Sequence, residues 1–247
     1  MRQVTRESAD VTDLHTHILP GMDDGSKDVE MSLAMLRTLA GMGVDTVCAT
    51  SHFYAQQNDT AHFYARREQA LHVLRAALPA DEQLPRLLPA AEVAYFPSME
   101  QHHLSRLCVE GTRTLLLEMP FSEWTELQTE TVAALALDRG FQVVLVHPER
   151  FCFSKGNRRK LEELAQLPIG LQVNADSLLH WHTRRLALEL LELTSLPLLG
   201  SDCHNLTTRP PNLKGGRDIV QKKLGAAFLA RMDENARRIT APCPEHT

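Results

Sequence analysis

Short apolar runs alternate with longer amphipathic segments along the chain, which is the pattern of buried parallel strands separated by helices. We predict strands at 11–14, 44–49, 87–91, 114–117, 142–146, 170–173 and 198–201. The segments between them predict helices at about 29–40, 60–78, 99–107, 125–139, 157–167, 177–193 and 213–238. Seven strands alternating with helices in 247 residues favour an α/β barrel over an open doubly wound sheet.

The same pattern predicts one domain over 1–247, with a polar lead-in at 1–10 and a tail at 239–247. Ser26 is a candidate cap for the first helix. The loop after the first strand contains neither a Gly-x-Gly-x-x-Gly nor a Gly-x-x-x-x-Gly-Lys-Ser/Thr motif, so dinucleotide-binding and P-loop interpretations lack their main support.

Composition narrows the class of protein. Hydrophobic residues make up 43% of the chain and charged residues 23%, as in ordinary soluble domains. The formal charge of −5 disfavours general nucleic-acid binding. The longest apolar runs are far shorter than the roughly 20 residues of a membrane span, and 1–10 lacks the apolar core of a secretory signal. We therefore expect a cytoplasmic protein with no membrane span and no nucleic-acid partner.

Imidazole and carboxylate groups follow most of the predicted strands. His15 and His17 are two residues apart, so they share one face of an extended chain and can reach one metal ion together. A His-x-His pair alone is weak, because the chain has 12 histidines. Further candidate ligands follow later strands: His52, Glu92, Glu118, His147, Asp202 and His204. In a parallel barrel these strand ends converge on one mouth.

So many ionisable groups in one cavity would be costly without compensation, and divalent cations are the natural way to neutralise them. Since a tetrahedral site takes about four ligands, the set predicts two or three ions, and its donors suit Mn, Fe or Zn. Neighbouring cations can stabilise the attacking and leaving oxygens of a phosphoryl displacement. Arg150 and Arg209 could bind phosphate oxygens at the rim, although a surface salt bridge is the commoner role of either arginine taken alone.

Several short segments keep a characteristic order and spacing. They are DLHTH at 13–17, DDG at 23–25, ATSH at 49–52, LPAAE at 88–92, LLEMPF at 116–121, VHPER at 146–150, SDCHN at 201–205 and TRPP at 208–211. Together they resemble the polymerase and histidinol phosphatase (PHP) superfamily. Within it they are most similar to the bacterial capsule- and exopolysaccharide-linked protein tyrosine phosphatases. The resemblance covers nearly the whole chain, from Asp13 to Pro211.

This resemblance implies a distorted (β/α)7 PHP barrel and a trinuclear site, commonly with manganese, that hydrolyses phosphotyrosine. The implied substrate is an autophosphorylating tyrosine kinase of polysaccharide export. The implied catalytic residues are Arg150, Arg209 and His52, with both arginines as phosphate clamps. The implied metal ligands are His15, His17, Asp24, His52, Glu92, Glu118, His147, Asp202 and His204. Asp24 enters only through the resemblance, because its local sequence indicates a turn.

The chain departs from the relatives' pattern at two places near the expected substrate rim. Phe53 stands where a polar or basic residue is frequent, and Ala91 where glycine is frequent. Aromatic side chains could flank a phosphotyrosine ring, although packing is their commoner role: Tyr54, Phe53, Trp124 and Phe151.

Other chemistry has less support. The string Cys-x5-Arg of thiol-dependent phosphatases occurs at Cys203–Arg209 and at Cys152–Arg158, but neither loop has the glycines that would cradle a phosphate. The five cysteines are scattered and include no Cys-x-x-Cys pair. The Gly-x-Ser-x-Gly elbow of a serine hydrolase is absent. We expect no role for the remaining histidines, His62, His72, His102, His103, His180 and His182.

Two alternatives stay open at the sequence level. The same chemistry could act on a small phosphomonoester such as histidinol phosphate, or the chain could bind metal in a regulatory role without turnover. Sequence also leaves self-association into a homo-oligomer open.

Overall fold

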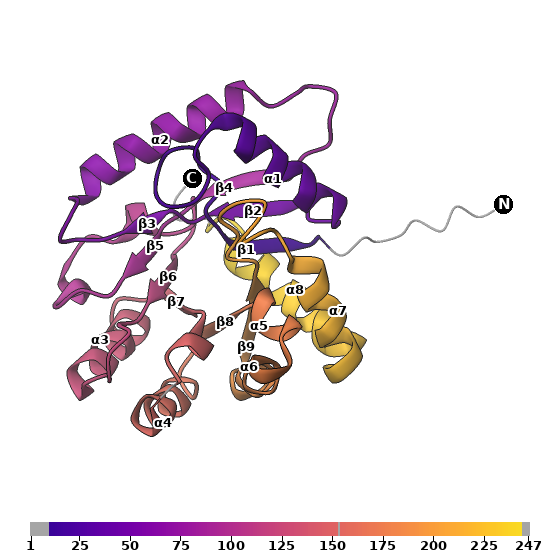
Figure 1. Ribbon diagram of the computed structural model, residues 1–247. Coiled ribbons are helices and arrows are strands. Elements are labelled where there is room, and N and C mark those ends of the chain that lie inside the picture. Colours follow the sequence, from indigo (N-terminus) through magenta and orange to yellow (C-terminus); the bar gives the residue numbers. More distant parts are fainter. Residues whose placement is uncertain (1–9, 153, 244–247) are drawn as a thin grey trace.

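The computed structural model describes residues 10–152 and 154–243. In Figure 1 the strands occupy the middle of the molecule and the helices surround them. The strands are β1 (Thr12–Thr16), β2 (Thr46–Ala49), β3 (His52–Phe53), β4 (Arg86–Pro89), β5 (Glu92–Ala94), β6 (Thr114–Glu118), β7 (Gln142–Val146), β8 (Gly170–Asn174) and β9 (Leu196–Gly200). The α-helices are α1 (Val29–Gly41), α2 (Thr60–Ala76), α3 (Glu126–Leu137), α4 (Lys155–Leu164), α5 (Ala175–Leu179), α6 (Trp181–Leu193), α7 (Leu213–Leu224) and α8 (Ala226–Thr240).

The strands form two parallel sheets, in the orders β1-β2-β4 and β3-β5-β6-β7-β8-β9. The strands predicted at 44–49 and 87–91 correspond to β2 and β4, and each is followed by a short strand that was not predicted, β3 and β5, in the other sheet. The barrel closes where β1 meets the end of β9: the amide of His17 donates to Cys203 O at 2.9 Å, and the amide of Asp202 to His15 O at 2.8 Å. Seven strand positions therefore surround the barrel, and the predicted α/β distorted-barrel class is confirmed.

The core lies in two regions. A large set of apolar side chains fills the space between the sheets and the helices. A smaller set, including Leu14, Leu116 and Val144, joins Ala236 and Ile239 of α8. Thr114 Oγ1 also donates to Ile239 O at 2.6 Å, which ties the start of β6 to α8. Helix α8 thus packs against the end of the strands away from His15 and Glu118.

Several predicted helices differ from the structure. Asp28, not Ser26, caps α1, because its side chain accepts from the amide of Met31. The predicted helix at 99–107 is wrong: that segment contains two short 3-10 helices, Met99–Gln101 and Ser105–Leu107. The helix predicted at 177–193 is divided at His180, whose backbone is extended, and that at 213–238 is divided at Gly225, whose φ is +93°.

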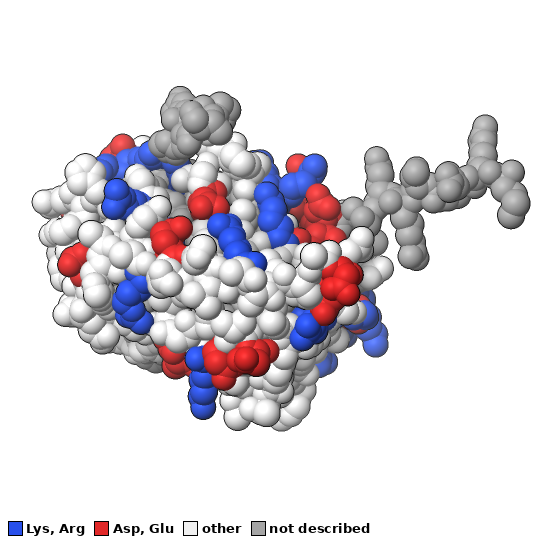
Figure 2. Space-filling model, turned by 90° about the horizontal axis from the view of Figure 1, so that it is seen from above, with Lys and Arg blue, Asp and Glu red and all other residues white. Residues whose placement is uncertain are grey.

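The two ends of the chain were predicted as a lead-in and a tail. Residues 1–9 and 244–247 lie outside the described residues, while 239 and 240 belong to α8 rather than to a tail. No helix within the described part of the chain is long and apolar enough to cross a membrane. On the face that Figure 2 shows from above, acidic and basic side chains are interspersed over the described residues.

Candidate metal centre

The centre of the barrel mouth is formed by two histidines: His15 belongs to β1, and His17 directly follows the end of that strand. The Nε2 atoms of these two imidazoles face each other at 3.1 Å. His15 Nδ1 donates to Gln172 Oε1 at 2.8 Å, and His17 Nδ1 donates to Asp23 Oδ2 at 2.9 Å. Since these partners accept hydrogen bonds, each Nδ1 carries a proton and each Nε2 faces the cavity. At the Nε2 positions a bound cation can take the place of a proton.

Glu92 occupies the middle of the site, at the start of β5. Its Oε2 lies 3.2 Å from His15 Nε2, 3.3 Å from His17 Nε2 and 2.9 Å from His52 Nδ1. Its Oε1 lies 2.7 Å from His147 Nε2. Since Glu92 is buried, these imidazoles surround a carboxylate that water does not reach.

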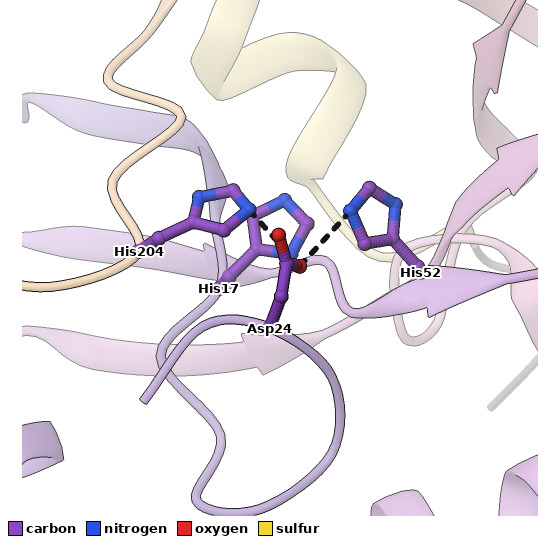
Figure 3. Close-up of side chains that lie close together, drawn as sticks. All are labelled: His17, Asp24, His52 and His204. Atoms are coloured by element: carbon purple, nitrogen blue, oxygen red, sulfur yellow. Dashed lines mark ion pairs between the residues drawn. The ribbon is translucent and has the colours of Figure 1, made fainter. Parts of the chain in front are cut away.

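Asp24 brings a further carboxylate from the loop that follows β1. Its Oδ1 lies 3.4 Å from His52 Nε2 and 3.4 Å from His204 Nε2, and the side chain is 65% exposed. Figure 3 shows Asp24 between these two rings, with His17 behind it. The loop can approach because Gly25 packs on His17, where a Cβ would meet the backbone oxygen at 2.2 Å. Asp24 therefore faces the same cavity from its open side.

All nine residues predicted as ligands come together at this mouth. Their donor atoms form four overlapping groups, in each of which the atoms lie within 4.8 Å of one another. The groups are His17, Asp24, His52 and His204; His15, His17 and Asp202; His15, Glu92 and His147; and His52, Glu92 and Glu118. His52 Nδ1, Glu92 Oε2 and His204 Nε2 are buried and have no hydrogen-bond partner among the described residues. Such orphaned nitrogen and oxygen donors fit divalent cations.

The backbone is strained at two of the strand ends that enter the site. His147 and Asp202 have φ values of +35° and +54°, in the left-handed region that non-glycine residues rarely adopt. Strain of this kind concentrates at functional sites, where the surrounding structure enforces it. At Asp202 the amide is bound by His15 O, which fixes this conformation.

The pKa values indicate a site that attracts positive charge. Burial opposes protonation of His17, but its hydrogen bond with Asp23 and the nearby carboxylate of Glu92 raise its pKa to about 10. Burial likewise opposes ionisation of Asp202, but the charges of His15 and His17 lower its pKa to about 2. The cavity therefore holds charged carboxylates that stabilise a cation next to them.

Arg150 and Arg209 lie at the rim, as predicted. Arg209 Nη2 donates to Asp202 Oδ2 at 2.7 Å, and Arg150 Nη1 lies 3.8 Å from the same oxygen. Both line, with Asp202, a cavity of about 370 Å³. The Asn205 side chain holds the loop of Arg209, because its Oδ1 accepts from the amides of Thr207, Thr208 and Arg209. Two guanidinium groups therefore face one solvent-accessible cavity beside the ligand cluster.

The residues that orient the ligands were not identified from the sequence. Asp23 and Gln172 fix the two central imidazoles. Asn174 donates to Asp202 Oδ2 at 2.7 Å, and Asp13 accepts from the amides of Ser201 and His15. One signal was available: Gln172 and Asn174 alternate along β8 as His15 and His17 alternate along β1.

The aromatic residues considered from the sequence divide into two kinds. Phe53, Trp124 and Phe151 are buried in the core, so they do not offer a surface to substrate. Tyr54 is half-buried and stacks on His52 with ring centroids 5.3 Å apart. Burial of Phe53 also explains the apolar residue after His52, because it packs against Phe63.

The two cysteines of the Cys-x5-Arg strings are poorly suited to nucleophilic catalysis. Burial raises the pKa of Cys203 well above that of a free thiol. Burial also raises the pKa of Cys152 to about 11. Since the thiolate is the reactive form, neither side chain is activated.

The sequence is similar to that of a known protein family over nearly its whole length. A family model described as capsular polysaccharide synthesis, CpsB/CapC, matches residues 11–240. The tyrosine-protein phosphatase YwqE of Bacillus subtilis is 29% identical over 232 residues, which cover 91% of this chain and 89% of that protein. The tyrosine-protein phosphatase CpsB of Streptococcus pneumoniae is 29% identical over 227 residues, covering 87% and 91%.

Solved structures with a similar fold are also found. Crystal structures described as those of YwqE and CpsB, unique metal-dependent tyrosine phosphatases, match with a TM-score of 0.80 and 26% identity. The match covers 93% of this chain and 94% of that one. An amidohydrolase from Bifidobacterium longum shares only the fold, with a TM-score of 0.55 and 16% identity.

Proposed function

Because the chain belongs to the CpsB/CapC family of capsular polysaccharide synthesis, we propose that it is a metal-dependent protein tyrosine phosphatase. The observation that carries the proposal is the set of four overlapping ligand groups at the barrel mouth, next to two rim arginines. The relatives named as tyrosine-protein phosphatases favour this function over hydrolysis of a small metabolite.

The proposed ligands are the nine residues of the four groups, and we propose two or three ions, with Mn²⁺ ahead of Fe²⁺ or Zn²⁺. When bound, such cations supply Lewis-acid stabilisation of phosphoryl oxygens and lower the pKa of water. Gln172 and Asp23 hold His15 and His17 so that their Nε2 atoms face the cavity. The site is thus organised before substrate enters it.

The rim arginines provide the phosphate-binding groups of the proposal. Both contact Asp202 in the free protein, and their side chains are 42% and 38% exposed, so an incoming phosphate can reach them. A guanidinium can bind two phosphate oxygens at once and stabilise the charge that develops on them. Arg150 and Arg209 would therefore bind and orient the phosphoryl group.

The leaving group of phosphotyrosine is a phenolate with a pKa of about 10, so its departure needs only modest help from a proton donor. His52 is a candidate for this role, since its side chain is 16% exposed, more than those of His15 and His17. A ring nitrogen that does not bind a cation could hold the proton that the tyrosine oxygen takes up.

We further propose that the physiological substrate is a bacterial tyrosine autokinase, in keeping with the capsule-related description of the family. The test is phosphate release from phosphotyrosine peptides, phosphoserine peptides and histidinol phosphate by wild type, His15→Ala and Cys203→Ser. We expect turnover of several phosphotyrosine peptides, loss in His15→Ala and retention in Cys203→Ser. Turnover of histidinol phosphate alone would move the function to a metabolite, and loss in Cys203→Ser with retention in His15→Ala would contradict the metal site.

A further inference from the structure

The loop that follows β6 presents a large aromatic side chain to solvent beside the candidate site. Phe121 is 54% exposed and lies three residues after Glu118. Of the other aromatic residues near this rim, Phe53, Trp124 and Phe151 are buried, and Tyr54 is half-buried against His52. The exposed part of this ring is therefore free to contact a molecule bound at the rim.

The loop at 119–125 is held firmly, so the ring is presented in one place. Buried Asn157 of α4 accepts from the amide of Trp124 at 2.8 Å and donates to Ser122 O and Phe151 O, each at 3.1 Å. The indole of Trp124 donates to Pro120 O at 3.0 Å. These bonds fix the backbone on both sides of Phe121.

The Phe121 ring also lies directly against the phosphate-binding group. The guanidinium carbon of Arg150 is 5.0 Å from the ring centroid, within the range of a cation–π contact. On another side, Phe151 packs against the ring at a centroid distance of 4.9 Å. The buried Phe151 in turn lies 5.5 Å from the ring of His147. The exposed ring is thus connected to both the arginine and a ligand of the cluster.

We propose that Phe121 forms an aryl-binding subsite, which packs against the ring of an aryl phosphate while Arg150 holds its phosphate. This inference rests on the proposed function and specifies how the site selects its substrate class. A single ester oxygen joins phosphate to ring, so a ring whose phosphate reaches Arg150 must lie close to that arginine's neighbours. Alkyl phosphates offer Phe121 no aromatic surface. The rim would therefore favour phosphotyrosine over phosphoserine.

The test compares an aryl and an alkyl substrate in the metal-loaded enzyme. Wild type, Phe121→Ala, Phe121→Tyr and Leu127→Ala would be assayed for kcat/KM with phenyl phosphate and with phosphoserine, and for competitive inhibition by inorganic phosphate. An aromatic pair is worth about 0.5–1.5 kcal/mol, so Phe121→Ala should lower kcat/KM for phenyl phosphate about twofold to tenfold. Its phosphoserine activity and phosphate inhibition should not change, and Phe121→Tyr should behave as wild type. Leu127 is a matched control, because it is 66% exposed on α3 and belongs neither to the ligand groups nor to the lining of the cavity beside them.

Each other result overturns the subsite. Equal weakening of phenyl phosphate, phosphoserine and inorganic phosphate would show that Phe121 acts only by holding Arg150. Unchanged phenyl phosphate hydrolysis in Phe121→Ala would exclude the ring contact while leaving the proposed phosphatase function intact. If metal-loaded wild type released phosphate from no substrate, the proposed function and the subsite would both be wrong.

Discussion

The central imidazoles of the site are fixed at the nitrogen that points away from the cavity. Asp23 does this for His17 and also accepts from the amides of Gly25 and His52. It therefore couples the loop after β1 to two ligands at once. Partners of this kind set the ring orientation and the basicity of a ligand, so the affinity of the site depends on residues that never touch the metal.

Replacement of Asp23 tests this role. Asp23→Ala should weaken Mn²⁺ binding by about 10-fold to 100-fold, because the His17 ring loses its acceptor. Isothermal titration with Mn²⁺ measures the change. Asp28→Ala is the matched control: Asp28 caps α1 from the same loop, so its loss should cost about 1 kcal/mol of folding free energy with unchanged metal affinity. Equal metal affinity in Asp23→Ala and wild type would show that Asp23 does not orient His17.

The raised pKa values of the buried thiols predict that these cysteines react slowly at ordinary pH. Burial raises the pKa of Cys108 to about 12 and that of Cys152 to about 11. The reactive thiolate form of both is therefore scarce at pH 8 and increases only as the pH approaches these values. Alkylation of the native protein with iodoacetamide at pH 8, followed by mass spectrometry, should leave both unmodified, whereas unfolded protein should react. Rapid labelling of native Cys152 would contradict this.

The adjacent acids Asp23 and Asp24 show how far the sequence could predict the site. Residues placed at strand ends by the apolar pattern were all found at the mouth, since strand direction alone determines where those side chains gather. Two successive aspartates in a loop carry no such signal. Asp23 is turned inward to His17 and Asp24 outward to His52 and His204. This division depends on the loop backbone, which local composition does not encode.

At the scale of elements, β9 must approach β1 closely for the ligands of both strands to meet. Gly200, the last residue of β9, makes this approach possible: a Cβ there would lie 2.7 Å from His15 Cβ and 2.9 Å from Gln172 Nε2. Neither neighbour can move freely, since His15 and Gln172 are buried and hydrogen-bonded to each other.

We therefore expect Gly200→Ala to disturb the metal centre through the packing of these strands. It should destabilise the fold by about 1–3 kcal/mol, as overpacking does, and weaken Mn²⁺ binding as well. Gly41→Ala is the matched control, because a methyl group at the end of α1 meets nothing within 4 Å. That variant should be neutral or slightly stabilised. Urea unfolding and Mn²⁺ titration measure both effects, and wild-type behaviour of Gly200→Ala would contradict the packing argument.

Two features of the fold were not predicted, because the hydrophobic pattern does not contain the information that determines them. Apolar periodicity indicates which residues are buried but not which neighbour they contact. The change of sheet between β2 and β3 depends on Glu92, whose amide bonds with the carbonyls of Thr50 and Ser51. The break between α7 and α8 depends on the positive φ of Gly225, which a continuous amphipathic pattern hides. Both features are decided by tertiary contacts or by a single backbone angle.

For the whole molecule, the ligand cluster destabilises the folded state unless cations neutralise its buried carboxylates. Burial and the nearby charge of Glu92 raise the pKa of Glu118 to about 7, a sign of repulsion between the two carboxylates. Binding of a cation to the folded state alone should therefore stabilise the protein. The cluster draws on β1, β3, β5 and β6 and on the segments that follow β1, β7 and β9, so this stabilisation should extend to the whole barrel.

Removal of metal should accordingly lower the melting temperature. A ligand present at 100 times its Kd stabilises by about 2.7 kcal/mol. For a chain of this size each kcal/mol shifts Tm by roughly 2–4 °C. We expect chelation with EDTA to lower Tm by roughly 5–10 °C in wild type and by much less in His15→Ala, as measured by calorimetry. An equal shift in both proteins would show that the stabilising ion lies elsewhere.

The most direct measurement is phosphate release from a phosphotyrosine peptide by metal-stripped protein, with Mn²⁺, Fe²⁺ or Zn²⁺ added back separately. Stripped protein should be inactive, and at least one ion, with Mn²⁺ expected first, should restore turnover. Full activity of the stripped protein, or no activity with any of the three ions, would contradict a metal-dependent tyrosine phosphatase.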